Sequence, residues 1–377
     1  LKTDIQHNNF ESIAEFAKNN KIDLVVVGPE QPLADGIVDY MENREIKVFG
    51  PSKLASEIES SKAFAKKMMK QFHIPTADFQ VFSKNEKEMA LDLCKTICGT
   101  LVIKADGLAA GKGVAICETY RVAEKVIEEY FDGKFGDSSK TIVIEQYLQG
   151  EEASIFVITD GEEYVILPSA QDHKRVFDGD LGPNTGGMGA YSPAPIITNA
   201  LLSEIEKSII KPTLDGMRKL GRTFRGCLYV GLMITKEGLP KVIEYNCRFG
   251  DPETQAVLQL IEGDLDELLM SVANHKINKE AIKIKEGQFA SCVVLASGGY
   301  PEKFQSGYEI KGLESIDKNQ IKIYQSGTKI ENEKLITNGG RVLCLVSSDF
   351  NLKTSLQNIY LNIDKIHFDN KHYRTDI

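Results

Sequence analysis

"VIKADGLAAGKGVAI", residues 102–116, has the glycines and the lysine of a phosphate-binding loop. A P-loop has four residues between its two glycines, then Lys and then Ser or Thr, whose hydroxyl binds Mg²⁺. Here only three residues separate Gly107 from Gly111, and Gly113 stands where the hydroxyl should be. The following residues predict a second strand rather than a helix. The stretch therefore predicts a strand, a glycine loop and a strand, with backbone N–H groups and Lys112 available to cover phosphates.

Length and composition are those of a multidomain globular protein. The chain has 377 residues, of which 42% are hydrophobic and 26% charged, which favours two or three domains. A net charge of -9 without a basic cluster argues against nucleic acid as a partner. No apolar run approaches the ~18 residues that a membrane helix needs. The seven cysteines include no C-x-x-C pair, so we expect reduced thiols and a cytoplasmic location.

The first sixty residues alternate between helical and strand patterns. "IDLVVVGPE" (22–30) predicts a buried strand that ends in a tight turn at Gly28 to Glu30, and "ADGIVDYMENRE" (34–45) predicts a helix. Another strand follows in "IKVFGPS". Such units predict a parallel sheet whose ligands lie beyond the carboxyl ends of the strands, which places Glu30 and Ser52 at the functional edge.

A capped amphipathic helix opens the next part of the chain. In "SSKAFAKKMMKQF", Ser60 or Ser61 is the expected N-cap, and Lys62 lies in the first turn, where a cation is electrostatically unfavourable. Lys62 is either a solvated lysine or a phosphate contact. Lys104 ends the strand before the glycine loop, so its ammonium either reaches solvent at the strand end or points at what the loop covers.

The stretch "TIVIEQYLQGEEASIFVIT" (141–159) predicts two strands joined by a short connector. Its backbone could meet a flat adenine edge, and Glu152 could meet ribose hydroxyls. An ordinary charged turn is the alternative. The position of the connector after a phosphate loop favours the nucleotide interpretation.

The strongest local signal is "KVIEYNCRFGDPETQ", residues 241–255. Because side chains alternate along a strand, Glu244, Asn246 and Arg248 are expected on one face. A carboxylate, an amide oxygen and a guanidinium in one row predict a hard-cation site beside a phosphate clamp. Chance alternation on an exposed strand is the alternative, but the neighbouring residues are too apolar for it. Asp251 and Glu253 follow at a turn, where acids also favour the start of a helix.

Residues 172–195, "DHKRVFDGDLGPNTGGMGAYSPAP", are expected to form a long loop. Loops of this length inside a compact domain are usually functional or disordered. We interpret this one as a substrate platform and assign His173 no catalytic role.

Eight stretches in order give the chain a resemblance to the phosphoribosylamine-glycine ligase (glycinamide ribonucleotide synthetase) family of the ATP-grasp superfamily. They are "SSKAF", "VIKADGLAAGKGV", "IVIEQYLQGEEAS", "SAQDHKR", "GPNTGGMGAYSP", "VIEYNCRFGDPETQ", "ASGGYP" and "TNGGRVL". The resemblance covers nearly the whole chain. It implies an α/β and α+β multidomain fold in three parts: a parallel α/β domain (1–60), an ATP-grasp domain (61–285) with a mobile lid at about 75–145, and a C-terminal α+β domain (286–377).

The resemblance also implies a reaction in which ATP, glycine and 5-phosphoribosylamine give glycinamide ribonucleotide, ADP and phosphate. The ATP-binding residues would be Lys62, Lys104, Gly111, Lys112, Gly113, Glu145, Tyr147, Leu148 and Glu152. Glu244 and Asn246 would hold Mg²⁺ or Mn²⁺, while Arg248 and Lys104 would act on the transferring phosphoryl group. The small substrates would meet the "NTGGMG" loop (184–189) and Glu30, Asp172, Lys174, Gly187, Asp251 and Glu253. The protein is expected as a monomer or homodimer.

Two departures from the family pattern leave alternatives open. Many ATP-grasp relatives carry another metal-binding glutamate on the preceding strand, but "CLYVGLMIT" contains no acid. The glycine-rich "G-x-G-G-R-E" loop expected to hold the ribosylamine phosphate does not precede Leu1. The alternatives are therefore an N-terminally truncated, inactive ATP-binding form, or a different ATP-grasp carboxylate-amine ligase. The stretches "SAQDHKR" and "GPNTGGMGAYSP" argue against the second.

Overall fold

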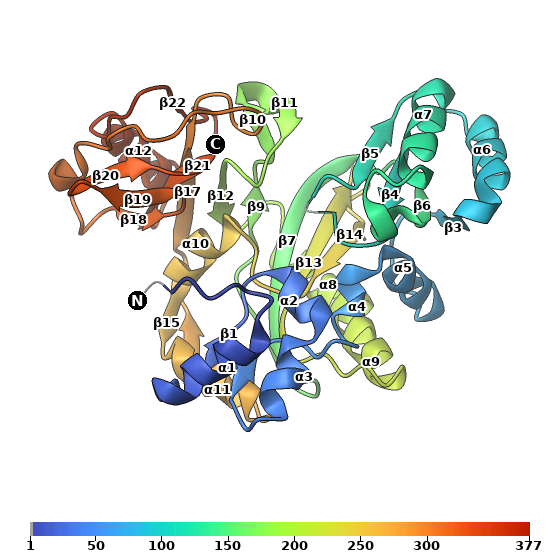
Figure 1. Ribbon diagram of the computed structural model, residues 1–377, viewed down its shortest axis with the longest axis horizontal. Helices are drawn as coiled ribbons and strands as arrows, with labels where there is room; N and C mark the ends of the chain where they lie inside the picture. The colour runs from blue at the N-terminus through green and yellow to red at the C-terminus, as the bar shows by residue number, and fades with distance from the viewer. Residues whose placement is uncertain (1–2, 110) are drawn as a thin grey trace.

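The hairpin predicted from residues 102–116 is present in the computed structural model, which describes residues 3–109 and 111–377. β4 (Leu101–Ala105) pairs antiparallel with β5 (Val114–Cys117), so that Lys104 lies opposite Val114. The hairpin belongs to a four-stranded sheet in the order β3-β6-β4-β5, with α6 and α7 packed against it over a separate core (Figure 1). The other elements of this lid segment are β3 (Phe79–Ser83), α6 (Lys87–Thr96), α7 (Tyr120–Phe131) and β6 (Thr141–Gln146).

A second antiparallel sheet, in the order β14-β13-β7-β8, lies across from the lid segment. Its central pair, β7 and β13, is buried and apolar over most of its length, apart from residues 150–152 at the start of β7. The predicted connector between β6 and β7 is confirmed and is only three residues long, 147–149. The elements are β7 (Gly150–Thr159), β8 (Tyr164–Ile166), β13 (Gly226–Thr235), β14 (Pro240–Asn246), α8 (Asn199–Ile205) and α9 (Lys211–Lys219).

The N-terminal residues form the predicted parallel pair, β1 (Val25–Val26) with β2 (Val48–Phe49). The expected turn at Glu30 and helix over 34–45 are wrong in detail. α2 (Glu30–Asp35) begins at Glu30, and Gly36, with φ +98°, ends it before α3 (Ile37–Glu42). A left-handed glycine is a common helix terminator, because the missing Cβ removes the steric cost. The remaining helices here are α1 (Phe10–Asn19) and α4 (Glu57–Ser60).

Helix α5 (Lys62–Gln71) begins as predicted. The Ser61 side chain accepts a hydrogen bond from the backbone N–H of Phe64, which satisfies one free donor of the first turn. The Asp106 carboxylate, at the end of β4, accepts bonds from Ala63 N at 2.6 Å and Ser61 Oγ at 3.0 Å. A carboxylate at a helix N-terminus is electrostatically favourable. The cap therefore also anchors the base of the glycine hairpin to α5.

The C-terminal sheet has the order β18-β21-β17-β12-β9, and β22 also pairs with β17. β9 and β12 come from the segment that was expected to be a long loop, so that prediction is wrong. Residues 172–195 also contain the hairpin β10-β11. Sequence periodicity missed these strands because they are short and rich in glycine and proline. The boundary at 285 and 286 stays a prediction, and this sheet has strands from both sides of it.

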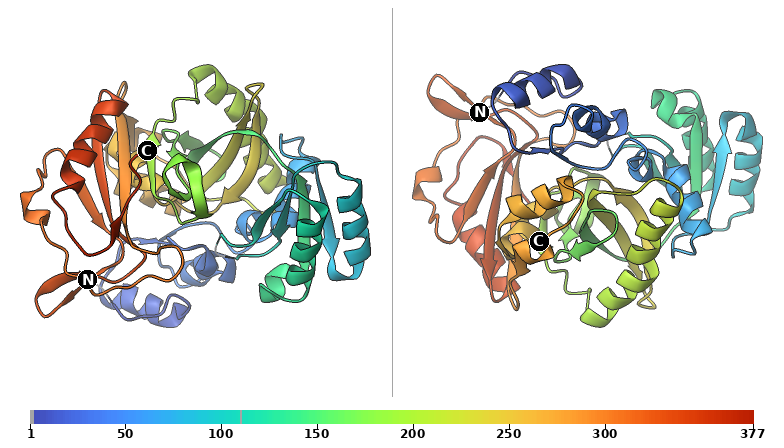
Figure 2. Two further views of the ribbon diagram at one scale, coloured as in Figure 1. Left: turned by 90° about the horizontal axis from the view of Figure 1, so that it is seen from above. Right: turned by 90° about the horizontal axis from the view of Figure 1, so that it is seen from below.

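The bounds of these elements complete the fold. They are β9 (Gln171–Asp172), β10 (Arg175–Phe177), β11 (Leu181–Asn184), β12 (Gly189–Ser192), α10 (Glu253–Val257), β15 (Ile261–Gly263), α11 (Leu265–Ala273), β16 (Ile282–Ile284), β17 (Phe289–Ser297), β18 (Lys322–Gln325), β19 (Thr328–Glu331), β20 (Lys334–Thr337), β21 (Arg341–Asp349), α12 (Leu352–Ile363) and β22 (Lys371–His372). Figure 2 shows the lid segment and the C-terminal sheet on opposite sides of the central sheet.

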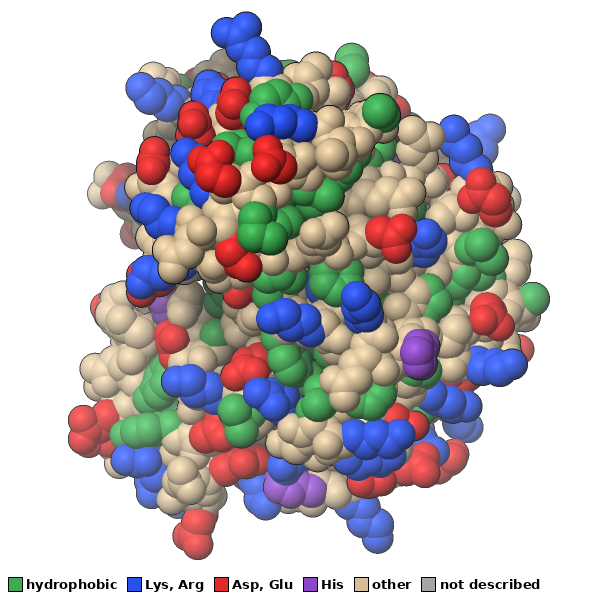
Figure 3. All heavy atoms as spheres, turned by 90° about the vertical axis from the view of Figure 1, so that its right-hand side faces the viewer, with side chains coloured by type: hydrophobic (Ala, Val, Ile, Leu, Met, Phe, Trp, Pro, Cys, Tyr) green, Lys and Arg blue, Asp and Glu red, His purple; other side chains and the backbone are tan. Residues whose placement is uncertain are grey.

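The surface carries both signs of charge. On the face with the lid segment, Lys and Arg side chains are interspersed with Asp and Glu (Figure 3). Within the part of the chain that the structure describes, every helix is too short or too polar to cross a membrane.

Candidate active site

A cleft of about 350 Å³ lies between the lid segment, the end of β14 and the segment that follows β9. Most of the predicted site residues line it, although they come from all parts of the chain. They are Glu30, Lys62, Lys104, Gly111, Gly113, Glu145, Glu152, Asp172, Lys174, Glu244, Asn246, Arg248, Asp251 and Glu253. Lys112, Tyr147, Leu148 and Gly187 do not line it.

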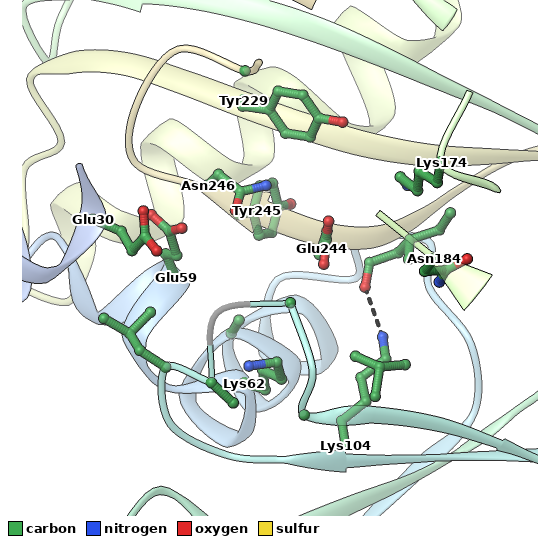
Figure 4. Close-up of a pocket in the computed structure, with 18 of the residues that line it drawn as sticks. Glu30, Glu59, Lys62, Lys104, Lys174, Asn184, Tyr229, Glu244, Tyr245 and Asn246 are labelled. Carbon is green, nitrogen blue, oxygen red and sulfur yellow. Dashed lines mark hydrogen bonds between the residues drawn. The ribbon is translucent and has the colours of Figure 1, made fainter. Parts of the chain in front are cut away.

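Glu244 lies at the centre of this cleft (Figure 4). It shares a face of β14 with Asn246, as the alternation predicted, and both side chains point into the cavity. Burial opposes ionisation of Glu244, but nearby positive charges outweigh it and hold the pKa of the carboxyl below its ordinary value. The cations are Lys174, Lys104, Lys62 and Arg248. A carboxylate with several cations around it is an arrangement that can hold a polyphosphate with its metal ion.

Lys104 is buried, with 5% of its surface exposed, so a solvated strand-end lysine is excluded. Its Nζ lies 3.1 Å from Oε1 of Glu145 and donates to the carbonyl oxygen of Ile243, also at 3.1 Å. The other oxygen of Glu145 pairs with Lys66 Nζ at 2.8 Å. The carboxylate of Glu145 therefore holds the ammonium groups of Lys66 and Lys104 at the cleft. The expected contact of Glu145 with a nucleotide stays a prediction.

Lys62 projects from the first turn of α5 into the cleft, where its Nζ donates to the carbonyl oxygen of Gly107 at 3.1 Å. Burial lowers the pKa of Lys62, although Glu244 opposes this. The bond ties the lysine to the glycine loop itself. Gly111 has φ +73°, and a Cβ on Gly113 would lie 2.7 Å from Cβ of Ala109, so the loop backbone depends on glycine at both positions.

Arg248 lies past the end of β14, so the expectation that it continues the row of Glu244 and Asn246 along the strand is wrong. Two carboxylates orient it instead: Glu30 Oε2 at 3.4 Å from Nε and Glu59 Oε1 at 3.7 Å from Nη2. Glu59 also accepts a bond from the backbone N–H of Cys247 at 2.7 Å. Burial raises the pKa of Glu59 to about 7, against the lowering effect of Arg248.

Three carboxyl groups and one lysine lie together in another part of the cleft wall: Glu152, Asp172, Glu253 and Lys174. Lys174 Nζ pairs with Glu152 Oε2 at 2.5 Å and lies 3.9 Å from Asp172 Oδ1. Burial opposes its charge, but these two carboxylates raise the pKa of Lys174 well above its ordinary value. Burial raises the pKa of Asp172. Burial and then the charge of Asp172 raise the pKa of Glu253 to about 7.

We expect Glu253→Gln to stabilise the fold at alkaline pH. A carboxyl whose pKa is raised on folding holds its proton more tightly in the folded state, so the free energy of unfolding falls as pH rises from about 4.5 to about 7. The neutral amide removes this loss, on the order of 1–3 kcal/mol. Urea unfolding should therefore show a higher midpoint for the variant at pH 8 and the same midpoint at pH 4.5.

The control for this prediction is Glu302→Gln, which replaces an exposed glutamate. It should leave the urea midpoint unchanged at both pH values. A Glu253→Gln midpoint that follows the wild type from pH 4.5 to pH 8 would contradict the assignment of a buried, proton-holding carboxyl.

Gly187 does not line the cleft but packs against Pro252, next to the cleft residues Asp251 and Glu253. Arg341, from β21, holds the neighbouring segment by donating to Asp251 Oδ2 and to the carbonyl oxygen of Gly186, each at 2.5 Å. Gly187 has φ +102°, and a Cβ there would lie 2.2 Å from Cδ of Pro252. The backbone at Gly187 therefore packs directly on the turn that carries Asp251 and Glu253.

We expect Gly187→Ala to destabilise the protein by roughly 2–5 kcal/mol, from left-handed backbone strain and overpacking. Gly238→Ala separates the two causes, because Gly238 also has positive φ (+77°) but a Cβ there would meet nothing within 4 Å. Thermal unfolding of both variants measures the difference. Equal losses of stability would show that the contact with Pro252 contributes nothing.

Among the cleft residues, Glu59, Lys66 and Tyr229 were not anticipated from the sequence, whereas Asn184 and Thr185 belong to the "NTGGMG" loop that the resemblance assigned to the small substrates. Lys66 could have been found, since it lies four residues after Lys62 and so on the same helical face. Glu59 and Tyr229 carry no local signal. Tyr147 lines a separate hollow of about 580 Å³ beside α6, and its expected role toward adenosine stays a prediction, as does that of Leu148.

A glycine hairpin on a small antiparallel sheet, facing a second sheet across a cleft of lysines and carboxylates, defines the ATP-grasp class of proteins. These enzymes use ATP with a divalent metal ion. A family model described as phosphoribosylglycinamide synthetase matches the chain in three parts: the N domain at residues 2–59, the ATP-grasp (A) domain at 60–254 and the C domain at 290–377. The chain belongs to this family.

Named relatives agree with the family match. The phosphoribosylamine-glycine ligase of Leptospira interrogans is 45% identical over 367 residues, 97% of this chain and 85% of that protein. The Escherichia coli K12 enzyme of that name is 44% identical, with 97% and 85% covered. A bifunctional purine biosynthetic protein of Pichia angusta is 46% identical, over 98% of this chain but 47% of that longer protein.

Solved structures share the architecture. The Thermotoga maritima phosphoribosylamine-glycine ligase has a TM-score of 0.77 at 37% identity, covering 88% of this chain and 81% of that one. A biotin carboxylase from Campylobacter jejuni has a TM-score of 0.73 at 17% identity, covering 97% and 79%. The second likeness concerns the fold alone, and both support the α/β and α+β multidomain expectation.

Proposed function

We propose that the chain ligates glycine to 5-phosphoribosylamine, converting ATP to ADP and phosphate and forming glycinamide ribonucleotide. The observation that carries this proposal is the position of Glu244, whose carboxylate is surrounded by Lys62, Lys104, Lys174 and Arg248 in a cleft under the glycine hairpin. Relatives that match nearly the whole chain are named for this reaction.

The first half-reaction is attack of a glycine carboxylate oxygen on the γ-phosphorus of ATP. An O–P bond forms, the bond to the ADP oxygen breaks, and glycyl phosphate results. Carboxylate and polyphosphate are both negative, so the site must neutralise charge and align the reactants rather than supply a strong base. Lys62 and Lys104 hold the phosphates, and Arg248, oriented by Glu30 and Glu59, stabilises the transferring phosphoryl group.

In the second half-reaction the amine of phosphoribosylamine attacks the acyl carbon, phosphate leaves, and the nitrogen loses a proton. Asp172, Lys174 and Glu253 face this side of the cleft and meet the small substrates. Asp251, held by Arg341, and Gly187 shape the wall beside them. Glycine and 5-phosphoribosylamine, like a monomeric or homodimeric state and a cytoplasmic location, are proposals.

Glu244 and Asn246 fit a divalent metal ion. Both offer oxygen ligands from neighbouring positions of one strand face, as Mg²⁺ and Mn²⁺ prefer, and phosphate oxygens complete such sites. Among residues 3–109 and 111–377, no set of three or more His, Cys, Asp or Glu side chains is arranged to hold a metal ion. Two protein ligands with phosphates therefore suit this chain, and the bound ion would neutralise the developing charge.

The test is ADP release with Mg²⁺ and glycine, with and without phosphoribosylamine generated from ribose 5-phosphate and ammonia. We expect release that requires both substrates. An exchange of Mg²⁺ for Mn²⁺ in the same assay determines the metal preference. Binding of ATP without any such release would contradict the proposal and favour an inactive ATP-binding form.

A further inference from the structure

Residues 371–376 lie against the hairpin β10-β11 (Figure 1). Arg374 is the centre of this contact. It is 1% exposed, which is exceptional for an arginine. Its Nη1 donates to Asp180 Oδ1 at 2.6 Å and to the carbonyl oxygen of Arg175 at 3.3 Å. These partners lie 194 and 199 residues away in the chain.

The rest of the guanidinium fork binds Asp376. Arg374 Nε donates to Oδ1 at 2.8 Å and Nη2 to Oδ2 at 2.9 Å. The hydrogen bonds from Arg374 lower the pKa of Asp376 to about 2, so both partners are charged at neutral pH. Asp376 in turn accepts a bond from the backbone N–H of Gly179 at 2.7 Å. A planar, bidentate pair of this kind fixes orientation as well as distance.

Three further bonds join the same pair of segments. Asp178 Oδ1 accepts from the backbone N–H of Thr375 at 2.9 Å, and Asp178 Oδ2 accepts from the Thr375 hydroxyl. His372 Nε2 lies 2.8 Å from the carbonyl oxygen of Val176. We call the contact between residues 175–180 and 372–376 the clasp.

The base of the clasped hairpin carries part of the cleft wall. Lys174 immediately precedes β10, Asn184 ends β11, and Thr185 follows it; all three line the cleft. Thr185 N and Thr185 Oγ1 both donate to the carbonyl oxygen of Lys174, at 2.7 and 2.9 Å. The two strands are paired with each other, and the bonds from Thr185 to Lys174 link them at the base of the hairpin. A shift of the outer part of the hairpin would therefore also move the side chains of Lys174, Asn184 and Thr185.

We propose that Arg374 is a positioning residue, which holds the hairpin β10-β11 so that Lys174, Asn184 and Thr185 meet the small substrates. The inference rests on the proposed function for the identity of those substrates. The nucleotide side of the cleft is built mainly by the lid segment, α5 and β14, none of which takes part in the clasp, and its contact with the clasped hairpin is the pair of Glu152, from β7, with Lys174. Loss of the clasp should therefore weaken the binding of the small substrates and leave the binding of ATP nearly unchanged.

Arg374→Ala is the first variant. We expect the KM for glycine to rise on the order of 10- to 100-fold, since misplacement by about 1 Å has effects of that size. The dissociation constant of a non-hydrolysable ATP analogue should stay within about twofold of wild type. Arg374→Lys, which keeps the charge but loses the fork, should restore the KM only in part.

Asp178→Ala keeps the inference testable where Arg374→Ala does not fold. It removes the bonds to Thr375 from an exposed position, while the buried Arg374 keeps both of its carboxylate partners, Asp180 and Asp376. It should raise the KM for glycine in the same direction by a smaller factor. Arg121→Ala, at an exposed arginine of α7, is the matched control and should change neither constant.

Hydrogen exchange gives a readout that does not need turnover. In the wild type, the amides of Gly179 and Thr375 should exchange slowly, and Arg374→Ala should speed exchange over residues 175–185 while the lid segment stays unchanged. If the wild-type protein had no ligase activity, the proposed function would be wrong, but hydrogen exchange would still test whether Arg374 holds the hairpin β10-β11 in place. Unchanged exchange, or equal losses of glycine and ATP-analogue binding, would overturn the role of Arg374.

Discussion

Glu244→Ala is expected to abolish metal-dependent ADP release while the protein remains folded. The carboxylate is the charged ligand of the proposed metal site and the anion among Lys174, Lys104, Lys62 and Arg248. A metal ion that polarises phosphoryl oxygens contributes several kcal/mol to the transition state, and each 1.36 kcal/mol is tenfold in rate. We therefore expect kcat/KM to fall by roughly 10³-fold or more, measured as ADP release across a Mg²⁺ titration.

Two further variants make this result specific. Glu244→Gln keeps the size of the side chain and removes the charge, so a comparable loss would assign the effect to charge rather than to packing. Glu237→Ala removes an exposed acid from the turn between β13 and β14 and should behave as wild type. Activity of Glu244→Ala close to wild type would remove the metal assignment.

Lys104→Met is expected to lower kcat by roughly 10²- to 10³-fold, the usual effect of deleting one transition-state donor. The methionine keeps the apolar stem and removes the ammonium. Lys66 remains paired with Glu145 at 2.8 Å, so the carboxylate keeps one cation. The loss of stability should therefore stay at about 1–3 kcal/mol, the cost of one lost partner for a buried polar group.

The measurement combines thermal unfolding, single-turnover ADP formation and binding of an ATP analogue. Lys125→Met, at an exposed lysine of α7, is the matched control and should retain wild-type rates. Should Lys104→Met lose stability but keep its rate of ADP formation, Lys104 would be a structural partner of Glu145 and not a phosphate ligand.

The sequence alone predicted those features that depend on a few neighbouring residues. Glycine spacing in residues 102–116 predicted the hairpin, because the need for small residues and positive φ is local. Ser61 predicted the start of α5, and strand alternation put Glu244 and Asn246 on one face. The ordered motifs predicted the family and hence the ATP-grasp fold, since together they sample every part of the chain.

Only the tertiary structure decided which charges meet. Strand alternation gave no correct place for Arg248, because the strand ends at Asn246 and the orientation comes from Glu30 and Glu59, which are distant in the chain. Strand β12, within residues 172–195, was missed because it is short and is stabilised by a sheet partner about a hundred residues later, β17, rather than by its own periodicity. The strand propensity of a short segment does not indicate which distant strand will pair with it in the folded protein.

The clasp is the clearest case of this division. Asp376, two residues later, accepts the paired bonds from Arg374, but nothing in the sequence shows that this arginine is buried, and its other carboxylate partner, Asp180, is 194 residues away. A guanidinium becomes buried only where folding brings enough acceptors around it to replace water. The sequence by itself thus determined the hairpin, the strand face that carries Glu244 and Asn246, and the family, while the packing of distant segments decided the orientation of Arg248 and the position of the hairpin β10-β11.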